Sequence, residues 1–135
     1  CAVVLLAVPK TRKTGYAAVL SLIFGVIVTN LLLKNIVARP RPFAEIEALI
    51  PLIAKPTDFS FPSGHTTASF AVALVMLRML PKKIGIPAVV LAALVAFSRL
   101  YLGVHYPTDV LTGFVVALVG SSLAVWGVRT KLGNQ

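Results

Sequence analysis

The chain has 135 residues, of which 58% are hydrophobic and 13% are charged, and its mean hydropathy is +0.93. Soluble globular domains carry about 25% charged residues, so this composition excludes an ordinary soluble domain and indicates a membrane protein. Thirteen basic and four acidic residues give a net charge of +9. Because no basic stripe is interleaved with aromatic residues, as in proteins that bind phosphodiester backbones, we expect no nucleic-acid partner.

The first apolar run, CAVVLLAV, ends after eight residues at Pro9 and Lys10. It is too short to cross a bilayer, since a spanning helix needs about 20 residues. We therefore expect the sequence to be part of a longer protein that has one or more helices before residue 1. The single cysteine, Cys1, excludes an internal disulfide bond.

Four longer apolar runs follow, at residues 15–33, 66–77, 84–98 and 110–128. Most of them approach the length of a membrane-spanning helix. Pro81 separates the second and third runs, and Pro87 falls in a first helical turn, where its missing N–H costs nothing. No internal repeat or low-complexity tract divides the chain. The sequence therefore predicts one domain over residues 1–135, an all-α polytopic transmembrane helical bundle.

Basic residues divide unequally between the two sides of such a bundle. If the four runs alternate in direction, eight of the thirteen lie on one side: Lys10, Arg12, Lys13, Arg78, Lys82, Lys83, Arg129 and Lys131. This side should be cytoplasmic by the positive-inside rule. The other five basic residues and all four acidic residues then face outward.

Three polar segments share the outer side: KNIVARPRP at 34–42, FPSGHTTAS at 61–69 and SRLYLGVHYPTD at 98–109. Taken singly, most of their residues have ordinary explanations. Lys34 and Arg41 are suited to anchoring a helix at the headgroups, and Ser63 is suited to capping a helix. Asp109 is a favourable acid for a first helical turn. Arg99 is different, because it lies between AALVAF and LYLGV and requires an anionic partner there.

Together the outer residues predict a phosphate site. If Ser63 caps a helix, the free N–H groups of Gly64 and its neighbours point outward at the positive end of the helix dipole. Lys34, Arg41 and Arg99 would add three cations, which suits a phosphoryl group that carries nearly two negative charges.

Two histidines give this site a nucleophile and a proton donor. His105 precedes Asp109 by four residues, and with Pro107 opening a helix the carboxylate can fold back towards the imidazole. One ring nitrogen is then held while the other is free to attack. His65 would protonate the departing oxygen. Because Asp109 is the only well-placed carboxylate and is committed to His105, we expect neither a metal ion nor another cofactor.

The three segments resemble the motifs of the type 2 phosphatidic acid phosphatase superfamily, membrane relatives of bacterial acid phosphatases and vanadium haloperoxidases. The first motif is a lysine followed by six residues and then Arg-Pro, and it is matched by Lys34, Arg41 and Pro42. The second motif, Pro-Ser-Gly-His, is matched by residues 62–65. The third motif is Ser-Arg, then five residues, a histidine, three residues and an aspartate. It is matched by Ser98, Arg99, His105 and Asp109. The matched core spans residues 34–109, and the flanking helices agree with the family in hydropathy only.

The resemblance implies a metal-independent phosphatase. His105 would be the nucleophile that forms a phosphohistidine, Asp109 its partner, and His65 the general acid. The phosphoryl oxygens would be held by Lys34, Arg41, Ser63, Gly64 and Arg99. A lipid phosphate or pyrophosphate of a bacterial cell membrane is the expected substrate, and undecaprenyl diphosphate, phosphatidylglycerol phosphate and phosphatidic acid remain open. No obligate protein partner is expected.

Arg39 is an extra cation two residues before Arg41. It would contact either the substrate or the lipid headgroups, and we favour the headgroups. Residues 43–61 form either an interfacial lid or a helix packed on the bundle, because their apolar residues recur at helical spacing: Phe43, Ile46, Leu49, Ile50 and Ile53. Two other functions would use a similar site. Haloperoxidase chemistry would use the same pocket, but those relatives are soluble, and a non-catalytic anion-binding component or carrier would need neither histidine.

Overall fold

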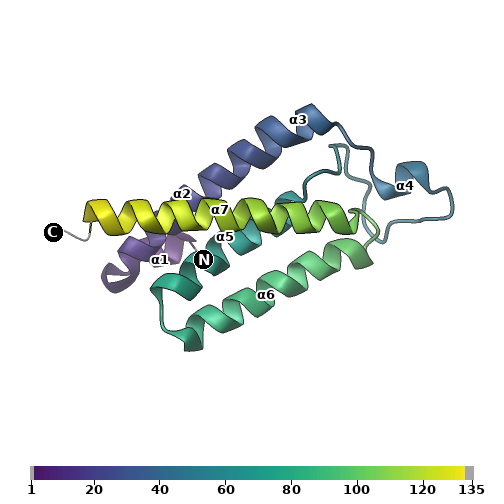
Figure 1. Cartoon of the computed structure of the whole chain (residues 1–135). Coiled ribbons are helices and arrows are strands. Elements are labelled where there is room, and N and C mark those ends of the chain that lie inside the picture. Colours follow the sequence, from purple (N-terminus) through teal and green to yellow (C-terminus); the bar gives the residue numbers. More distant parts are fainter. Residues whose placement is uncertain (1, 133–135) are drawn as a thin grey trace.

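The computed structural model describes residues 2–132 as a bundle of helices (Figure 1), and Cys1 lies outside the described residues. The elements in chain order are α1 (Ala2–Ala7), the 3₁₀ turn η1 (Pro9–Thr11), α2 (Arg12–Val26), the π-helical segment η2 (Ile27–Leu33), α3 (Lys34–Val37), α4 (Pro42–Glu45), α5 (Gly64–Met79), α6 (Lys82–Tyr101) and α7 (Pro107–Leu132). The described residues contain no strand, so the all-α prediction is confirmed.

Three of the four predicted apolar runs lie in helical stretches long and apolar enough to cross a membrane. These stretches are Pro9–Glu45, Lys82–Tyr101 and Pro107–Lys131. The remaining run lies in α5, which has 16 residues. At 1.5 Å per residue, α5 is about 24 Å long, which is shorter than the roughly 30 Å hydrocarbon core of a bilayer.

Helix α5 forms the centre of the bundle and packs against α2, α6 and α7, whereas α6 and α7 make few contacts with each other. The contacts use small buried residues, including Ala71 and Ala73 on α5, Ala92 on α6 and Ala117 on α7. Small side chains allow helix backbones to approach closely, which is how helices associate in a lipid solvent.

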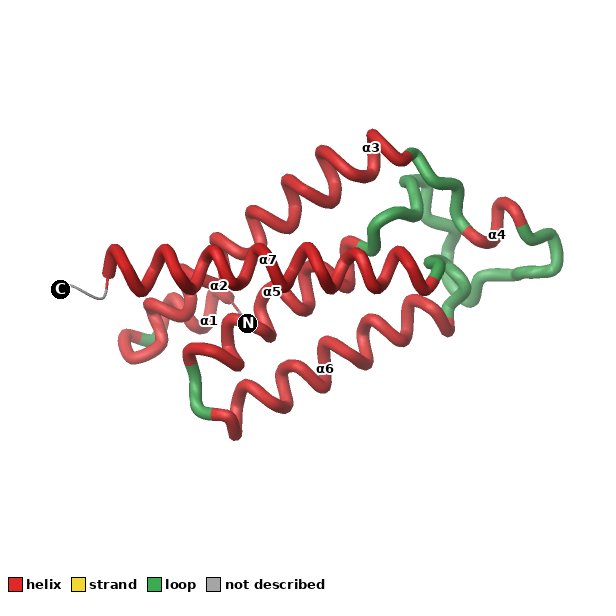
Figure 2. Tube along the Cα trace, viewed as in Figure 1, coloured by secondary structure: helices red, strands yellow, loops and turns green. Residues whose placement is uncertain are grey.

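The three motif segments meet at one end of the bundle. Figure 2 shows the long loops gathered there, beyond the ends of α3, α6 and α7. The approach of α7 to the start of α5 is especially close, because a β-carbon placed on Gly113 would lie 2.7 Å from the carbonyl oxygen of Ser63. Thr67 also donates its hydroxyl to the Gly113 carbonyl at 3.2 Å. Glycine at position 113 therefore brings the second and third motifs into contact.

The loop over residues 43–61 is not the helix that its apolar spacing predicts. Helix α4 ends at Glu45, and Ile46 is already extended (φ −110°, ψ 97°). Pro51 and Pro56 remove amide donors further along, and each proline pushes the residue before it away from helical geometry. The loop instead lies on the turn between α6 and α7, where the Leu52 N–H donates to the Leu102 carbonyl at 3.4 Å.

Candidate active site

A cavity of about 380 Å³ opens among η2, the start of α5 and the residues before α7. Six of the eight predicted site residues line it: Lys34, Arg41, Gly64, His65, Arg99 and His105. Ser63 and Asp109 are fully buried and are not among the lining residues. The volume is within the usual range for small-molecule sites, about 300–1,000 Å³.

Ser63 acts as the N-cap of α5. Its hydroxyl oxygen accepts from the Thr66 N–H at 3.4 Å and from the Thr66 hydroxyl at 3.0 Å. This buried position differs from the expected one, in which Ser63 holds a phosphoryl oxygen directly. The first N–H groups of a helix have no partner within the helix, so those of Gly64 and His65, both of which line the cavity, have the position that donors to an anion would need.

His105 and Asp109 lie together as the spacing predicts. Asp109 is the third residue of α7, and its Oδ2 accepts from the Tyr106 N–H at 2.8 Å. The same oxygen lies 3.5 Å from Nδ1 of His105, at the long limit of a hydrogen bond. Among residues 2–132, Nδ1 has no closer polar partner. Such contacts are often long before substrate binds and tighten in the reacting complex.

Arg41 lies beside the other ring nitrogen of His105, Nε2. Its Nη1 donates to the Val104 carbonyl at 2.7 Å and lies 3.4 Å from Nε2 of His105. A guanidinium can only donate, so this contact favours an unprotonated Nε2. The proton of the neutral ring then belongs on Nδ1, facing Asp109, and the lone pair of Nε2 faces Nη1 of Arg41, a residue that also lines the cavity.

Asp58 joins two of the predicted phosphate-binding cations. Its carboxylate accepts from Nζ of Lys34 and from Nη2 of Arg41, the latter at 2.6 Å. Partial burial opposes the ionisation of Asp58, but the hydrogen bonds from the two cations outweigh it and lower the pKa of this carboxyl to about 2. The sequence argument that Asp109 is the only carboxylate of the site was therefore wrong, although Asp58 is itself committed to two cations.

Arg99 lines the same cavity, and its guanidinium donates to the hydroxyl of Ser98 at 3.1 and 3.2 Å. Within the described part of the chain it has no acidic partner, as the four ion pairs found there involve other residues. Arg99 is thus available to an incoming anion without breaking an ion pair.

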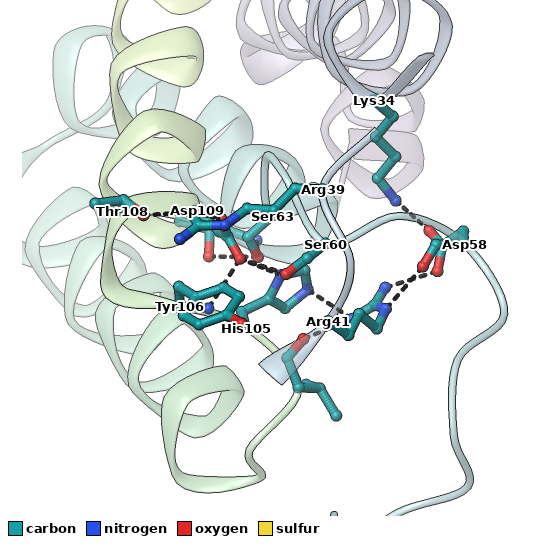
Figure 3. A network of polar contacts seen from close by, with 12 residues as sticks. Lys34, Arg39, Arg41, Asp58, Ser60, Ser63, His105, Tyr106, Thr108 and Asp109 are labelled. Atoms are coloured by element: carbon teal, nitrogen blue, oxygen red, sulfur yellow. Dashed lines mark hydrogen bonds and ion pairs between the residues drawn. The ribbon is translucent and has the colours of Figure 1, made fainter. Parts of the chain in front are cut away.

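Two residues that the sequence analysis did not assign to the site surround Asp109 (Figure 3). The Ser60 hydroxyl donates to Oδ2, and Arg39 Nη1 donates to Oδ1 at 3.0 Å. The expectation that Arg39 contacts headgroups was therefore wrong, because its guanidinium binds a buried carboxylate. No local pattern could have paired these residues, since they lie 49 and 70 positions from Asp109.

The widened helix η2 lies beside the cavity. Thr29 and Asn30 of this segment are lining residues, and Lys34 follows at its end. The hydroxyl of Thr29 donates to the Gly25 carbonyl, one turn earlier. π-Helical turns occur often at functional sites, and here the wider turn faces the cations.

A second cavity, of about 480 Å³, lies beside the first along α5. The two cavities share Leu22 and Ala68. Apart from Ser69, the second cavity is lined by apolar side chains, mainly from α5 and α6: Ala2, Val3, Leu22, Ala68, Val72, Ala73, Ala88, Leu91, Ala92 and Val95. The charged site therefore has an apolar cavity as its neighbour.

Comparison with known families agrees with this arrangement. The model of the PAP2 superfamily matches residues 15–132, which include all three motifs. The chain belongs to the PAP2 superfamily. The match confirms the resemblance drawn from the motifs and extends it over the flanking helices.

Individual PAP2 proteins are similar over most of this chain. An undecaprenyl-diphosphatase of Sulfolobus acidocaldarius is 36% identical over 127 residues, covering 94% of this chain and 60% of the relative. The transmembrane PAP2-type phosphatidylglycerolphosphate phosphatase of Bacillus subtilis is 31% identical with a TM-score of 0.74, covering 96% of this chain and 65% of that one. Aquifex aeolicus LpxE is 25% identical with a TM-score of 0.82, and the match covers 92% of this chain and 73% of LpxE.

The chain thus spans about 60% of the length of the first relative. With its three long apolar helices and its transmembrane relative, it is an integral membrane protein. Among residues 2–132 there is no group of three or more His, Cys, Asp or Glu side chains that could hold a metal ion.

Proposed function

We propose that this PAP2 protein hydrolyses a lipid phosphate or lipid pyrophosphate through a phosphohistidine on His105. The observation that carries the proposal is the cavity in which three basic residues, the start of α5 and two histidines converge. A dianionic phosphoryl group is the ligand that such a set of donors suits best.

The reaction would take two steps. In the first, the Nε2 lone pair of His105 forms a bond to phosphorus while the bond from phosphorus to the lipid oxygen breaks, and His65 donates a proton to that oxygen. In the second, water attacks phosphorus and gives its proton to His65, the N–P bond breaks, and inorganic phosphate leaves. Asp109 would hold the ring and stabilise its positive charge.

The cations and the helix terminus would supply electrostatic stabilisation. Negative charge builds on the equatorial oxygens of phosphorus as it is transferred, and fixed donors around those oxygens lower the barrier. Lys34, Arg41, Arg99 and the N–H groups of Gly64 and His65 are the donors that line the cavity.

The apolar cavity supports a lipid as the substrate. Because it shares Leu22 and Ala68 with the charged cavity, a molecule with its phosphate between the cations would place its tail against α5 and α6. Undecaprenyl diphosphate, phosphatidylglycerol phosphate and phosphatidic acid are the candidates. We further propose a bacterial cell membrane as the location, with the cavity facing outward, from the excess of basic residues at the opposite end.

A substrate panel tests the proposal. The purified protein is given each of the three lipids in detergent, with glycerol 3-phosphate as a phosphate that lacks an apolar tail, and inorganic phosphate is measured. We expect release from at least one lipid and little from glycerol 3-phosphate. Tight phosphate binding without release from any lipid would support the alternative of a non-catalytic anion-binding component or carrier.

A further inference from the structure

The Asp109 carboxylate is completely buried, with 0% of its side chain exposed. A buried carboxylate is unfavourable unless it is paired and hydrogen-bonded. A histidine that faces it at 3.5 Å and must stay neutral in order to attack cannot supply the compensating charge. A cation other than His105 must therefore compensate the negative charge of Asp109.

Arg39 is that cation, and it approaches the side of the carboxylate away from the histidine. Its Nη1 donates to Oδ1 of Asp109 at 3.0 Å, whereas Oδ2 is the oxygen that faces His105. Nη1 also donates to the Thr108 hydroxyl at 2.7 Å. Arg39 thus does not occupy Oδ2, which faces His105 and accepts from Ser60 and the Tyr106 N–H, and Arg39 is not among the residues that line the cavity.

The Arg39 side chain is held by more than the ion pair. Its guanidinium carbon lies 3.9 Å from the centroid of the Tyr106 ring, a cation–π distance. The Tyr106 hydroxyl donates in turn to Glu45 of α4. One third of the Arg39 side chain remains exposed. The guanidinium therefore lies in a fixed orientation between the outer surface and Asp109.

The backbone reinforces this placement. Val37 ends α3, Ala38 takes a left-handed conformation (φ 47°), and Pro40 restricts Arg39 to extended geometry. The Arg39 carbonyl accepts from the Ser60 N–H at 2.9 Å, and the Ser60 hydroxyl donates to Asp109. Because that backbone bond does not involve the side chain, a substitution of Arg39 removes the guanidinium and leaves the loop contact in place.

We infer that Arg39 is a positioning residue of the reaction, which acts through Asp109 to keep the His105 ring oriented and its proton on Nδ1. Arg39 also compensates the charge of the buried carboxylate. This inference rests on the proposed roles of His105 and Asp109. It assigns a function to the first arginine of ARPRP, which the superfamily motif matched here does not include.

A double-mutant cycle tests the inference. The variants are Arg39→Gln, Arg39→Lys, Asp109→Asn and the double Arg39→Gln/Asp109→Asn, with Lys55→Gln as the control that removes another cation from the outer loop. We expect Arg39→Gln to lower kcat by about 10- to 100-fold, as loss of an orienting partner does at other sites, with KM changed less than about twofold. Arg39→Lys should recover part of the rate. In the Asp109→Asn background, Arg39→Gln should have little further effect.

An activity-independent measurement accompanies the cycle. The chain has only two histidines, so ¹⁵N NMR of the imidazoles in detergent micelles resolves them with the aid of a His65→Gln variant. We expect the neutral His105 ring to carry its proton on Nδ1, and Arg39→Gln to produce a mixture of the two tautomers. The Lys55→Gln spectrum should match that of the unaltered protein.

The outcomes separate the inference from the proposed function. A His105→Ala protein with full activity overturns the phosphohistidine proposal. An inactive His105→Ala protein together with an Arg39→Gln protein of normal rate and unchanged tautomer overturns the inference alone. Equal losses from Arg39→Gln in both Asp109 backgrounds indicate a merely structural role, and a raised KM with unchanged kcat indicates a headgroup contact. Each of these last two results would also overturn the inference that Arg39 positions His105 through Asp109.

Discussion

The N–H of Ser63 donates to the backbone carbonyl of Asp109 at 3.0 Å, so the cap of α5 is joined directly to the first turn of α7. Through this bond the helix end that would bind phosphate and the residue that would orient the nucleophile form one unit. Ser63 and Asp109 lie 46 positions apart in the chain, and their relative position depends on how closely α5 and α7 pack.

Gly113→Ala should disturb this unit. Its β-carbon would lie 2.7 Å from the Ser63 carbonyl oxygen, and such overpacking costs about 1–3 kcal/mol. Gly127 of the same helix has nothing within 4 Å of the corresponding position, so Gly127→Ala should be neutral or stabilising by up to about 1 kcal/mol. Thermal unfolding in detergent, followed by circular dichroism, compares the two. A Gly113→Ala protein as stable as Gly127→Ala would contradict the close contact.

Asp58→Asn should strengthen inhibition by inorganic phosphate. The ionised carboxylate and a bound phosphate both require Lys34 and Arg41, so phosphate has to displace the carboxylate. Exposed ion pairs contribute about 0.2–1 kcal/mol each, and Asp58 is 54% exposed, so the inhibition constant should fall by about 2- to 30-fold. Phosphate inhibition at constant ionic strength measures this change.

The control for Asp58 is Glu47→Gln, which removes another exposed acid from the same outer loop and should leave inhibition unchanged. Because the pKa of Asp58 is about 2, its carboxylate stays ionised from pH 5 to pH 8, and the effect should be constant over that range. Weaker phosphate inhibition in Asp58→Asn would show instead that Asp58 holds the cations in place for the ligand.

Chelation should leave activity intact. Of the two carboxylates at the site, Asp58 binds Lys34 and Arg41, and Asp109 binds Arg39 and Ser60. Neither has the free oxygens that a hard divalent cation requires, and the three basic residues of the cavity repel such an ion. Initial rates before and after EDTA treatment should agree. Loss of turnover that magnesium restores would rule out the proposed mechanism.

Short-range sequence relationships predicted much of this site. Ser63 caps α5 and Asp109 folds back to Tyr106 and His105 because each geometry is set within about one helical turn. The positions of Arg39 and Asp58 could not be predicted in this way. Both depend on where the loop before α5 crosses the start of α7, and that crossing is fixed by tertiary packing. The apolar spacing in residues 43–61 was misleading, since α4 already ends at Glu45 and prolines interrupt only the later part of the segment.

Orientation in the membrane can be tested with single cysteines. After removal of Cys1, a cysteine is placed at Lys13 or at Thr57, and intact cells are treated with an impermeant thiol reagent. The excess of basic residues at the end that carries Lys13 predicts a cytoplasmic location for it, so only position 57 should react. Permeabilised cells, in which both positions should react, are the control. Labelling at position 13 alone would reverse the proposed orientation.

The alanine variants of the two histidines should differ in their residual activity. His105→Ala should abolish turnover and form no covalent species, because among the described residues that line the cavity only His105 contacts the Asp109 carboxylate. His65→Ala should lose about 10²–10⁴-fold in rate and recover partly with nitrophenyl phosphate, whose leaving group needs no proton. Rapid quench with ³²P-labelled substrate, followed by mapping of the base-stable, acid-labile label, distinguishes them. Label on a residue other than His105 would exclude His105 as the nucleophile, and equal loss with both substrates in His65→Ala would exclude His65 as the acid.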